Sequence, residues 1–184
     1  MQPNYFENVW QYAPSFIKIE LDEATLNKVD KFIAKVIAKK SQEAHHQIDN
    51  AKEFTRWKTG VLGECAVEKY LGKKFVSFRV GDSKTHNYAD LKPLGFDCGI
   101  KTSEYGKYPI VAKPSVRDEI IVVKFSDSVY YLCGLATPKI LNAYQTDDYI
   151  LSPALKARGT KSAFYGFDKL HSPEKVLNLI LCSN

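Results

Sequence analysis

A run of mostly β-branched residues, from Glu119 to Phe125, constrains the fold of this chain more than any other feature. A strand that is apolar at nearly every position, rather than at alternate positions, suits a sheet covered on both faces. Ser126-Asp127-Ser128 predicts a turn, and the residues from Val129 to Ala136 predict a second strand that returns beside the first. We therefore expect a central sheet with further elements on each side.

Helical patterns precede this strand pair. Residues 22–40 predict an amphipathic helix with Asp22 as its N-cap. Its apolar residues recur at steps of three and four, at Leu26, Val29, Ile33, Val36 and Ile37. The polar residues 41–56 are expected to continue helically, and a further helix is expected from Trp57 to Leu71, ending at Gly72.

Shorter patterns complete the layout. A two-residue period predicts strands at 75–80, 88–91 and 96–102, the last two joined by a turn at 93–95. A short helix capped by Thr137 is expected through Tyr144, and a last helix from Ser172. The order of elements predicts one α/β domain, with a helical part at 1–56, a core at 57–145 and a C-terminal extension at 146–184.

Composition limits the class of protein. Lys and Arg number 26 against 21 Asp and Glu, and the net charge of +5 permits attraction to a polyanion such as nucleic acid without establishing it. No apolar run approaches the roughly 18 residues of a membrane span, and the N-terminus lacks the pattern of a signal peptide. The cysteines, at Cys65, Cys98, Cys133 and Cys182, are too far apart in sequence for a zinc or redox motif. We expect reduced core thiols, a cytoplasmic location and no membrane partner.

Three acids and one lysine are arranged so that they could converge. Glu64 shares one side of the helix predicted at 57–71 with apolar residues, so its carboxylate needs an interior partner or a cleft. Asp97 and Lys101 would lie on one face of the strand 96–102, with Asp90 across the turn. Taken singly, each residue has an ordinary alternative: Glu64 as a salt-bridged helix residue, Asp90 as a turn residue, and Lys101 as a charge that prevents edge-to-edge pairing of a strand.

Such a group would have the chemistry of phosphodiester hydrolysis. Carboxylates hold Mg²⁺ through their oxygens, and the bound metal orients a phosphate and lowers the pKa of a water molecule. A neighbouring lysine can position that water and stabilise the charge that develops on the phosphate. The sequence therefore predicts a metal-dependent hydrolase that cleaves phosphodiesters.

The order of these segments resembles the PD-(D/E)xK, or restriction-endonuclease-like, nuclease superfamily. The resemblance spans about residues 57–145 and rests on Gly63-Glu64 in a helix, Ala89-Asp90 at a hairpin, and a strand that reads Gly99-Ile100-Lys101-Thr102-Ser103. It implies a mixed central sheet flanked by helices and a metal site for Mg²⁺ or Mn²⁺ that includes Glu64, Asp90 and Lys101. It also implies a DNA substrate, permits a homodimer, and suggests an origin in a phage or mobile element.

One position departs from the pattern of that family. The acid expected two residues before Lys101 is replaced by Gly99. Asp97 is expected to supply the missing carboxylate, so that Glu64, Asp90 and Asp97 are the predicted metal ligands and, with Lys101, the predicted catalytic residues. Without that acid the protein would be an inactive nuclease fold that binds nucleic acid or a protein partner, as an inhibitor or regulator. A third alternative is a structural or accessory phage protein whose acids and lysine pair with each other.

Basic residues near the C-terminus offer a further contact for nucleic acid. Lys156, Arg158 and Lys161 lie in a segment, 155–161, that resembles a mobile phosphate-contacting loop, and such residues are the usual phosphate donors. The alternative is an ordinary solvated face. The leading hypothesis from the sequence is a metal-dependent nuclease that acts on DNA.

Overall fold

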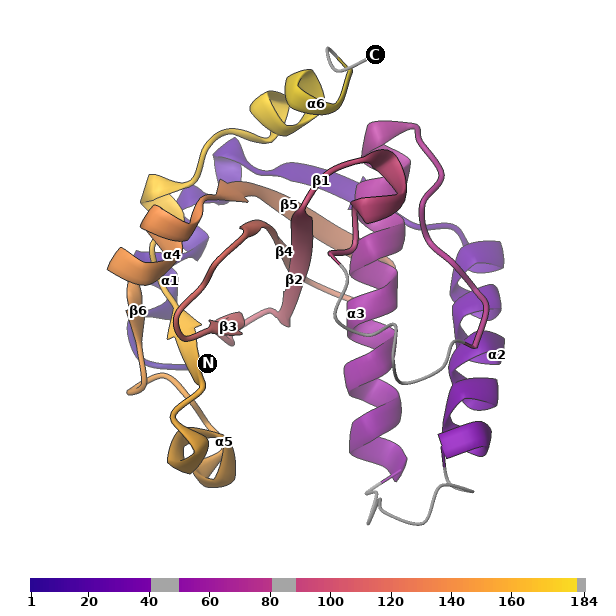
Figure 1. Ribbon diagram of the computed structural model, residues 1–184, viewed down its shortest axis with the longest axis horizontal. Coiled ribbons are helices and arrows are strands. Elements are labelled where there is room, and N and C mark those ends of the chain that lie inside the picture. The colour runs from indigo at the N-terminus through magenta and orange to yellow at the C-terminus, as the bar shows by residue number, and fades with distance from the viewer. Residues whose placement is uncertain (41–49, 81–88, 182–184) are drawn as a thin grey trace.

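Two sheets and the helices around them make up the computed structural model, which describes residues 1–40, 50–80 and 89–181 (Figure 1). The strands are β1 (Ile17–Glu20), β2 (Cys98–Glu104), β3 (Ile110–Ala112), β4 (Asp118–Lys124), β5 (Val129–Ala136), β6 (Gln145–Thr146) and β7 (Lys161–Phe164). The α-helices are α1 (Tyr5–Asn8), α2 (Glu23–Lys40), α3 (Asn50–Leu71), α4 (Pro138–Ala143), α5 (Pro153–Arg158) and α6 (Pro173–Leu181). Short 3₁₀ helices are η1 (Trp10–Ser15), η3 (Lys92–Leu94) and η4 (Phe167–Lys169).

The larger sheet is mixed and has the strand order β1-β5-β4-β2, whereas the smaller has the order β3-β7-β6. β2 runs parallel to β4, and β5 is antiparallel to both β4 and β1. The predicted strand pair at 119–125 and 129–136 is confirmed as β4 and β5. The expectation of a mixed α/β fold with a mixed central sheet and helices is also confirmed.

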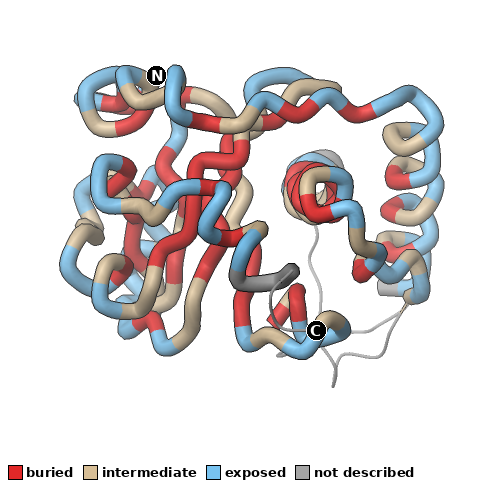
Figure 2. Tube along the Cα trace, turned by 90° about the horizontal axis from the view of Figure 1, so that it is seen from above, coloured by how far each residue is buried: buried red, intermediate tan, exposed pale blue. Residues whose placement is uncertain are grey.

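The apolar run of β4 has a clear structural cause, because the sheet separates two hydrophobic cores. Ile120 and Val122 pack in a first core with α2 and α3, and Ile121 and Val123 pack in a second core with the N-terminal segment and the smaller sheet. Alternate side chains of a strand point to opposite faces, so both faces of β4 must be apolar. Figure 2 shows the resulting line of buried residues along the central strands.

Helix α3 lies directly against β2, and α2 packs on α3 (Figure 1). Gly63 permits this approach, since a Cβ built there would lie 1.8 Å from Oγ1 of Thr102 on β2. Gly60 has open space around it and plays no such part. The predicted ends of the two helices are confirmed: the Asp22 carboxylate accepts a hydrogen bond from the Thr25 amide, and Gly72 follows α3 with a φ of 65°.

Other terminal elements also agree with the sequence. Thr137 caps α4 by accepting a hydrogen bond from the Ile140 amide, and α6 begins at Pro173. Cys65, Cys98 and Cys133 are buried free thiols, as expected, and Cys182 lies outside the described residues. No helix within residues 1–40, 50–80 and 89–181 is both long and apolar enough to span a bilayer.

Several predicted elements are wrong. The N-terminal part is not wholly helical, because β1 forms an edge of the larger sheet. The strand predicted at 75–80 is irregular, because the Glu68 carboxylate accepts the amides of Phe75 and Val76 at 2.7 and 2.8 Å and so takes donors that a strand would use. The segment expected as a mobile loop, 155–161, instead contains the end of α5 and the start of β7.

In the predicted hairpin, the strand at 96–102 is confirmed from Cys98 onward as β2, whereas the described end of the short strand at 88–91 is a turn. Residues 90–91 form a turn that leads into η3, and the Leu91 amide bonds the Cys98 carbonyl at 3.0 Å. Tyr88, at the start of the predicted first strand, lies outside the described residues, as does the segment 41–49 of the predicted helical continuation. The predicted helical continuation is confirmed for residues 50–56, because α3 begins at Asn50 and runs without a break into the helix predicted from Trp57.

Candidate functional site

A pocket of about 270 Å³ lies beside β2 and β4 and is lined by two carboxylates, three basic side chains and one glycine. We call it the acid pocket; its charged lining consists of Asp90, Lys101, Arg117, Glu119 and Lys161, and Gly99 and Ser115 also line it. These residues come from the turn before η3, from β2, β4 and β7, and from the loop before β4. The pocket therefore gathers opposite charges from five separate segments.

The Glu119 carboxylate occupies the space that a side chain at Gly99 would fill. The parallel register places Gly99 opposite Glu119, and a Cβ built on Gly99 would lie 2.2 Å from Glu119 Oε2. The missing side chain at Gly99 is therefore what makes room for the carboxylate of the neighbouring strand. Sequence reasoning missed Glu119; its one signal was an acid at the start of an otherwise buried strand.

The Glu119 carboxylate is buried and only partly satisfied. The residue is 6% exposed, and Oε1 lies 3.6 Å from Lys101 Nζ. Oε2 is buried with no hydrogen-bond partner among the described residues. Burial raises the pKa of Glu119 above its usual value, with Lys101 opposing the effect and Asp90 adding to it. A buried oxygen of this kind favours a cationic or hydrogen-donating ligand, because an unpaired buried acceptor is costly.

Asp90 is held against β2 by its own side chain. Oδ2 accepts a hydrogen bond from the Ile100 amide at 2.6 Å, which ties the turn to the strand that carries Lys101. Burial raises the pKa of Asp90, while the Ile100 hydrogen bond, Lys101 and Arg117 act against that rise. The Ile100 amide thus positions the Asp90 carboxylate, and Lys101 and Arg117 are the cations that act on its charge.

Glu64 belongs to the same electrostatic group, from the helix side. It follows Gly63, the residue at which α3 meets β2. Burial, and next the charge of Asp90, raise the pKa of Glu64 to about 8, whereas Lys101 lowers it. Of the sequence-predicted residues, Asp90 and Lys101 line the acid pocket, whereas Glu64 is coupled to both electrostatically without lining it.

Asp97 is not brought to this group. β2 begins at Cys98, so the strand alternation that would align Asp97 with residues 99 and 101 does not extend to it. Asp97 is exposed and instead lines a separate hollow of about 80 Å³ together with Asp118. The position expected to replace the missing acid is thus on another surface, and Glu119 fills the place.

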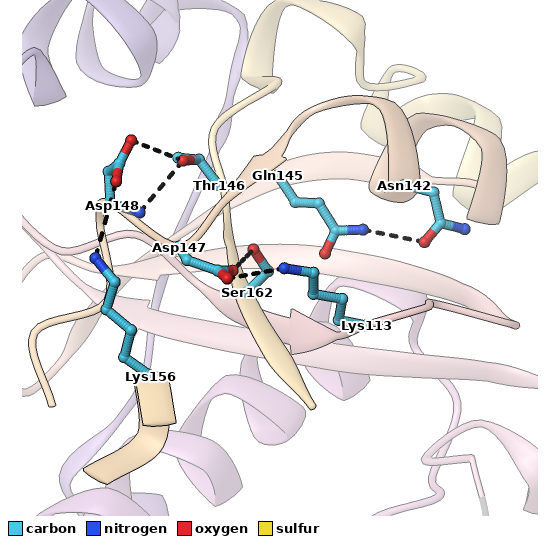
Figure 3. A network of polar contacts seen from close by, with 8 residues as sticks. All are labelled: Lys113, Asn142, Gln145, Thr146, Asp147, Asp148, Lys156 and Ser162. Atoms are coloured by element: carbon cyan, nitrogen blue, oxygen red, sulfur yellow. Dashed lines mark hydrogen bonds and ion pairs between the residues drawn. The ribbon is translucent and has the colours of Figure 1, made fainter. Parts of the chain in front are cut away.

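The three predicted nucleic-acid contacts diverge. Lys161 lines the acid pocket from the start of β7. Lys156 lies on α5, where its Nζ is 3.8 Å from the Asp148 carboxylate (Figure 3), and Arg158 is exposed at the end of that helix. Of these three, Lys161 alone lines the acid pocket.

A polar network fixes the loop that carries Arg117 over the acid pocket. The Ser115 amide donates to Asn142 Oδ1, and Asn142 Nδ2 donates to the Ser115 carbonyl, both at 2.8 Å. Lys113 is ion-paired with Asp147 at 2.8 Å, and Asp147 also accepts from the Ser162 hydroxyl at 2.7 Å (Figure 3). The loop is therefore anchored at two points on one side of the pocket.

A larger groove, of about 730 Å³, adjoins the acid pocket at Lys101, which lines both. We call it the basic groove, after the cations Lys52, Arg56, Lys101 and Lys107 in its lining. One wall is formed by α3 and the other by β2, the residues that lead into β3, and Leu155 of α5. Figure 1 shows α3 on one side of this region, with β3 and α5 on the other.

The donor set fits a hard cation that keeps part of its water shell. Within the described part of the chain, no group of three or more His, Cys, Asp or Glu side chains is placed to hold a metal ion by itself. Mg²⁺, however, usually takes only one or two protein carboxylates, and water and substrate phosphate supply its other ligands. Asp90 and Glu119, with the unsatisfied Glu119 Oε2, meet that smaller requirement.

Comparison of the chain with protein-family models, curated proteins and solved structures gave no match.

Proposed function

We propose that the chain is a metal-dependent nuclease of the PD-(D/E)xK, restriction-endonuclease-like kind, in which Glu119 replaces the acid missing at Gly99. The observation that carries the proposal is the Glu119 carboxylate lying in the space that a side chain at Gly99 would fill. The transfer of an acid to the neighbouring parallel strand keeps a carboxylate beside Lys101. The order of Glu64, Asp90 and Lys101 along the chain supports the same assignment.

Asp90 and Glu119 would hold Mg²⁺ or Mn²⁺, and Glu64 would act on the site through its electrostatic coupling to Asp90 and Lys101. The bound metal would supply an activated water and neutralise charge on the scissile phosphate. Lys101 lies where it can orient that water or hydrogen-bond the phosphate. Arg117 and Lys161 add positive charge at the rim, which favours a polyanionic substrate, and DNA is the substrate that we propose.

Cleavage of DNA by matched variants tests this proposal. Supercoiled plasmid and single-stranded DNA are incubated with Mg²⁺ or Mn²⁺ and wild type, Glu119→Gln, Asp90→Asn, Lys101→Ala or the control Asp97→Asn. We expect Glu119→Gln and Asp90→Asn to lose cutting because they remove metal ligands, and Lys101→Ala to lose at least about 100-fold in rate, the lower range for removing a group that assists proton transfer. Asp97→Asn should cut like wild type, because Asp97 lies on another surface. Equal cutting by wild type and Glu119→Gln would remove Glu119 from the mechanism.

One observation favours a second candidate, an inactive nuclease fold that binds nucleic acid or a protein partner. Lys101 is already ion-paired with Glu119, which lowers the need for a metal ion at that carboxylate. Calorimetry with Mn²⁺ separates the two candidates. Absence of metal binding together with retained DNA or protein binding would support the inactive fold, whereas metal binding that disappears in Glu119→Gln would support the nuclease.

A further inference from the structure

We propose that the basic groove binds a nucleoside phosphate, presented as one or two nucleotides of an unpaired nucleic acid strand. The inference deepens the proposed function, on which it rests only for the direction of the strand toward the acid pocket. It starts from the groove itself, whose volume of about 730 Å³ lies within the usual size of a small-ligand site, ~300–1,000 Å³. Such a space suits one or two nucleotides rather than a duplex.

Three residues of the groove lining carry a buried hydroxyl that has no hydrogen-bond partner among the described residues. These hydroxyls are Oγ1 of Thr59, Oγ1 of Thr102 and Oγ of Ser103. They are three of the eight such side-chain atoms in that part of the chain, and Thr59 and Ser103 are each only 7% exposed. An unsatisfied buried hydroxyl costs about 1–3 kcal/mol, so those of Thr59 and Ser103 favour a ligand rich in oxygen, whereas Thr102 Oγ1 faces Gly63 of α3.

The charge of the groove selects an anion. Lys52 and Arg56 lie on α3, and Lys101 and Lys107 face them from the opposite wall. Glu104 is the one acid in the lining, and it is ion-paired with Lys107. The lining thus carries four cations against one carboxylate, while Glu53 and Glu119, outside the lining, are ion-paired with Arg56 and Lys101. Lys, Arg and hydroxyl side chains are the usual donors to nucleic acid phosphates.

An apolar wall completes the recognition of a nucleotide. Pro109, Ile110 and Leu155 line the groove beside the cations and offer a surface for a base. Tyr108 supports this wall rather than stacking on a ligand, because its ring is already stacked on Tyr149 with centroids 4.3 Å apart. A ligand with a flat apolar ring, hydroxyl-bonding oxygens and a phosphate satisfies all three parts of the groove.

Lys101 gives the groove its place in the proposed reaction. Because this lysine lines both hollows, a strand that fills the groove continues directly into the acid pocket. The groove would therefore hold the nucleotides next to the scissile phosphate. An unpaired strand can enter, whereas a duplex would have to open first.

Binding in EDTA tests the inference without requiring metal or cleavage. The probes are a fluorescein-labelled single strand of about ten nucleotides, a length typical of single-strand sites, and the matching duplex. We expect the single strand to bind at least tenfold more tightly than the duplex. Competition with unlabelled dAMP and with unlabelled strand distinguishes the two sources of the ligand: displacement by dAMP indicates recognition of one nucleotide, and displacement by the strand alone indicates recognition of a chain.

Two hydroxyl deletions give a readout that a structural role would not produce. Thr59→Val and Ser103→Ala each remove an unsatisfied group, so the melting temperature should stay level or rise, while strand affinity should fall about 2- to 10-fold, the value of one hydrogen bond. Tyr130→Phe is the matched control, because it removes another unsatisfied buried hydroxyl from the first core. It should leave strand affinity unchanged.

Equal or tighter duplex binding, or wild-type strand affinity in both hydroxyl variants, would overturn the inference. That failure is distinguishable from failure of the proposed nuclease. Mn²⁺ binding at Glu119 is measured separately and does not depend on Thr59 or Ser103.

Discussion

The proposed transfer of an acid from β2 to β4 can be reversed by mutation. Adding a side chain at Gly99 should be destabilising as long as Glu119 is present, because the new Cβ would lie 2.2 Å from Glu119 Oε2 and 2.9 Å from its Cδ. That overlap in a packed site costs about 1–3 kcal/mol, the usual range for an added group without room. Gly99→Asp should cost more than Gly99→Ala, since it also adds a negative charge beside Glu119.

The double variant Gly99→Asp/Glu119→Gly should recover most of the lost stability. It removes the overlapping carboxylate and returns one acid to β2, at the position where the family pattern has it. Contacting residues show interaction free energies of about 0.5–3 kcal/mol, and this pair should fall near the upper end of that range. Both changes together are therefore expected to be less harmful than Gly99→Asp alone.

Urea denaturation in EDTA measures the four free energies of unfolding, for wild type, the two single variants and the double variant. Calorimetry with Mn²⁺ on the same proteins should show binding in wild type, loss in Glu119→Gly and recovery in the double variant. The reasoning would be refuted if Gly99→Asp were as stable as wild type, or if the double variant lost the sum of the two single losses. Either result would mean that the Glu119 carboxylate does not fill the space at Gly99.

Three further predictions concern neighbouring groups. In metal-free protein the free energy of unfolding should fall as the pH rises from about 4.5 to about 8, because folded Glu64 keeps its proton up to a pKa of about 8 while the unfolded chain has lost it. One proton changes this free energy by at most ~1.4 kcal/mol per pH unit. An unchanged pH slope in Glu64→Gln would contradict this origin. Gly63→Ala should cost about 1–3 kcal/mol of stability through its overlap with Thr102. Gly60→Ala, in open space, should instead gain up to about 1 kcal/mol of helix stability. Equal melting temperatures of the two variants would disprove the close approach of α3 to β2. Glu68→Ala should cost about 1–3 kcal/mol and speed hydrogen exchange at the two backbone amides that its carboxylate binds, and unchanged exchange there would argue against that role.

Local sequence patterns were sufficient where one segment determines its own structure. The apolar run of β4, the Asp22 cap of α2 and the glycine after α3 each act within a few residues, and the structure agrees with all three. The irregular segment 75–80 was mispredicted because a distant carboxylate, Glu68, binds its amides. A residue pattern with period two does not reveal such a competing acceptor.

In the candidate site, too, the sequence revealed some residues and not others. Glu64, Asp90 and Lys101 could be found from their order along the chain, but the partner of Gly99 could not. Glu119 reaches Gly99 only through the parallel pairing of β2 with β4, which joins residues twenty positions apart. Asp97 was expected instead because it is close in sequence, and the start of β2 at Cys98 removes it from the strand face.

The register between β2 and β4 links the site to the stability of the fold. A shift of β4 by one residue would move every side chain of the strand to the opposite face of the sheet. Ile120 and Val122 would then leave the first core, at a large cost in buried apolar surface. The same shift would move Glu119 away from Gly99 and Lys101 and into an apolar layer. The two cores on either side of β4 therefore enforce the one register in which a buried carboxylate meets both an empty Cβ position and a lysine. A substitution that loosens either core should thus weaken metal binding as well as stability, even when it lies far from the acid pocket.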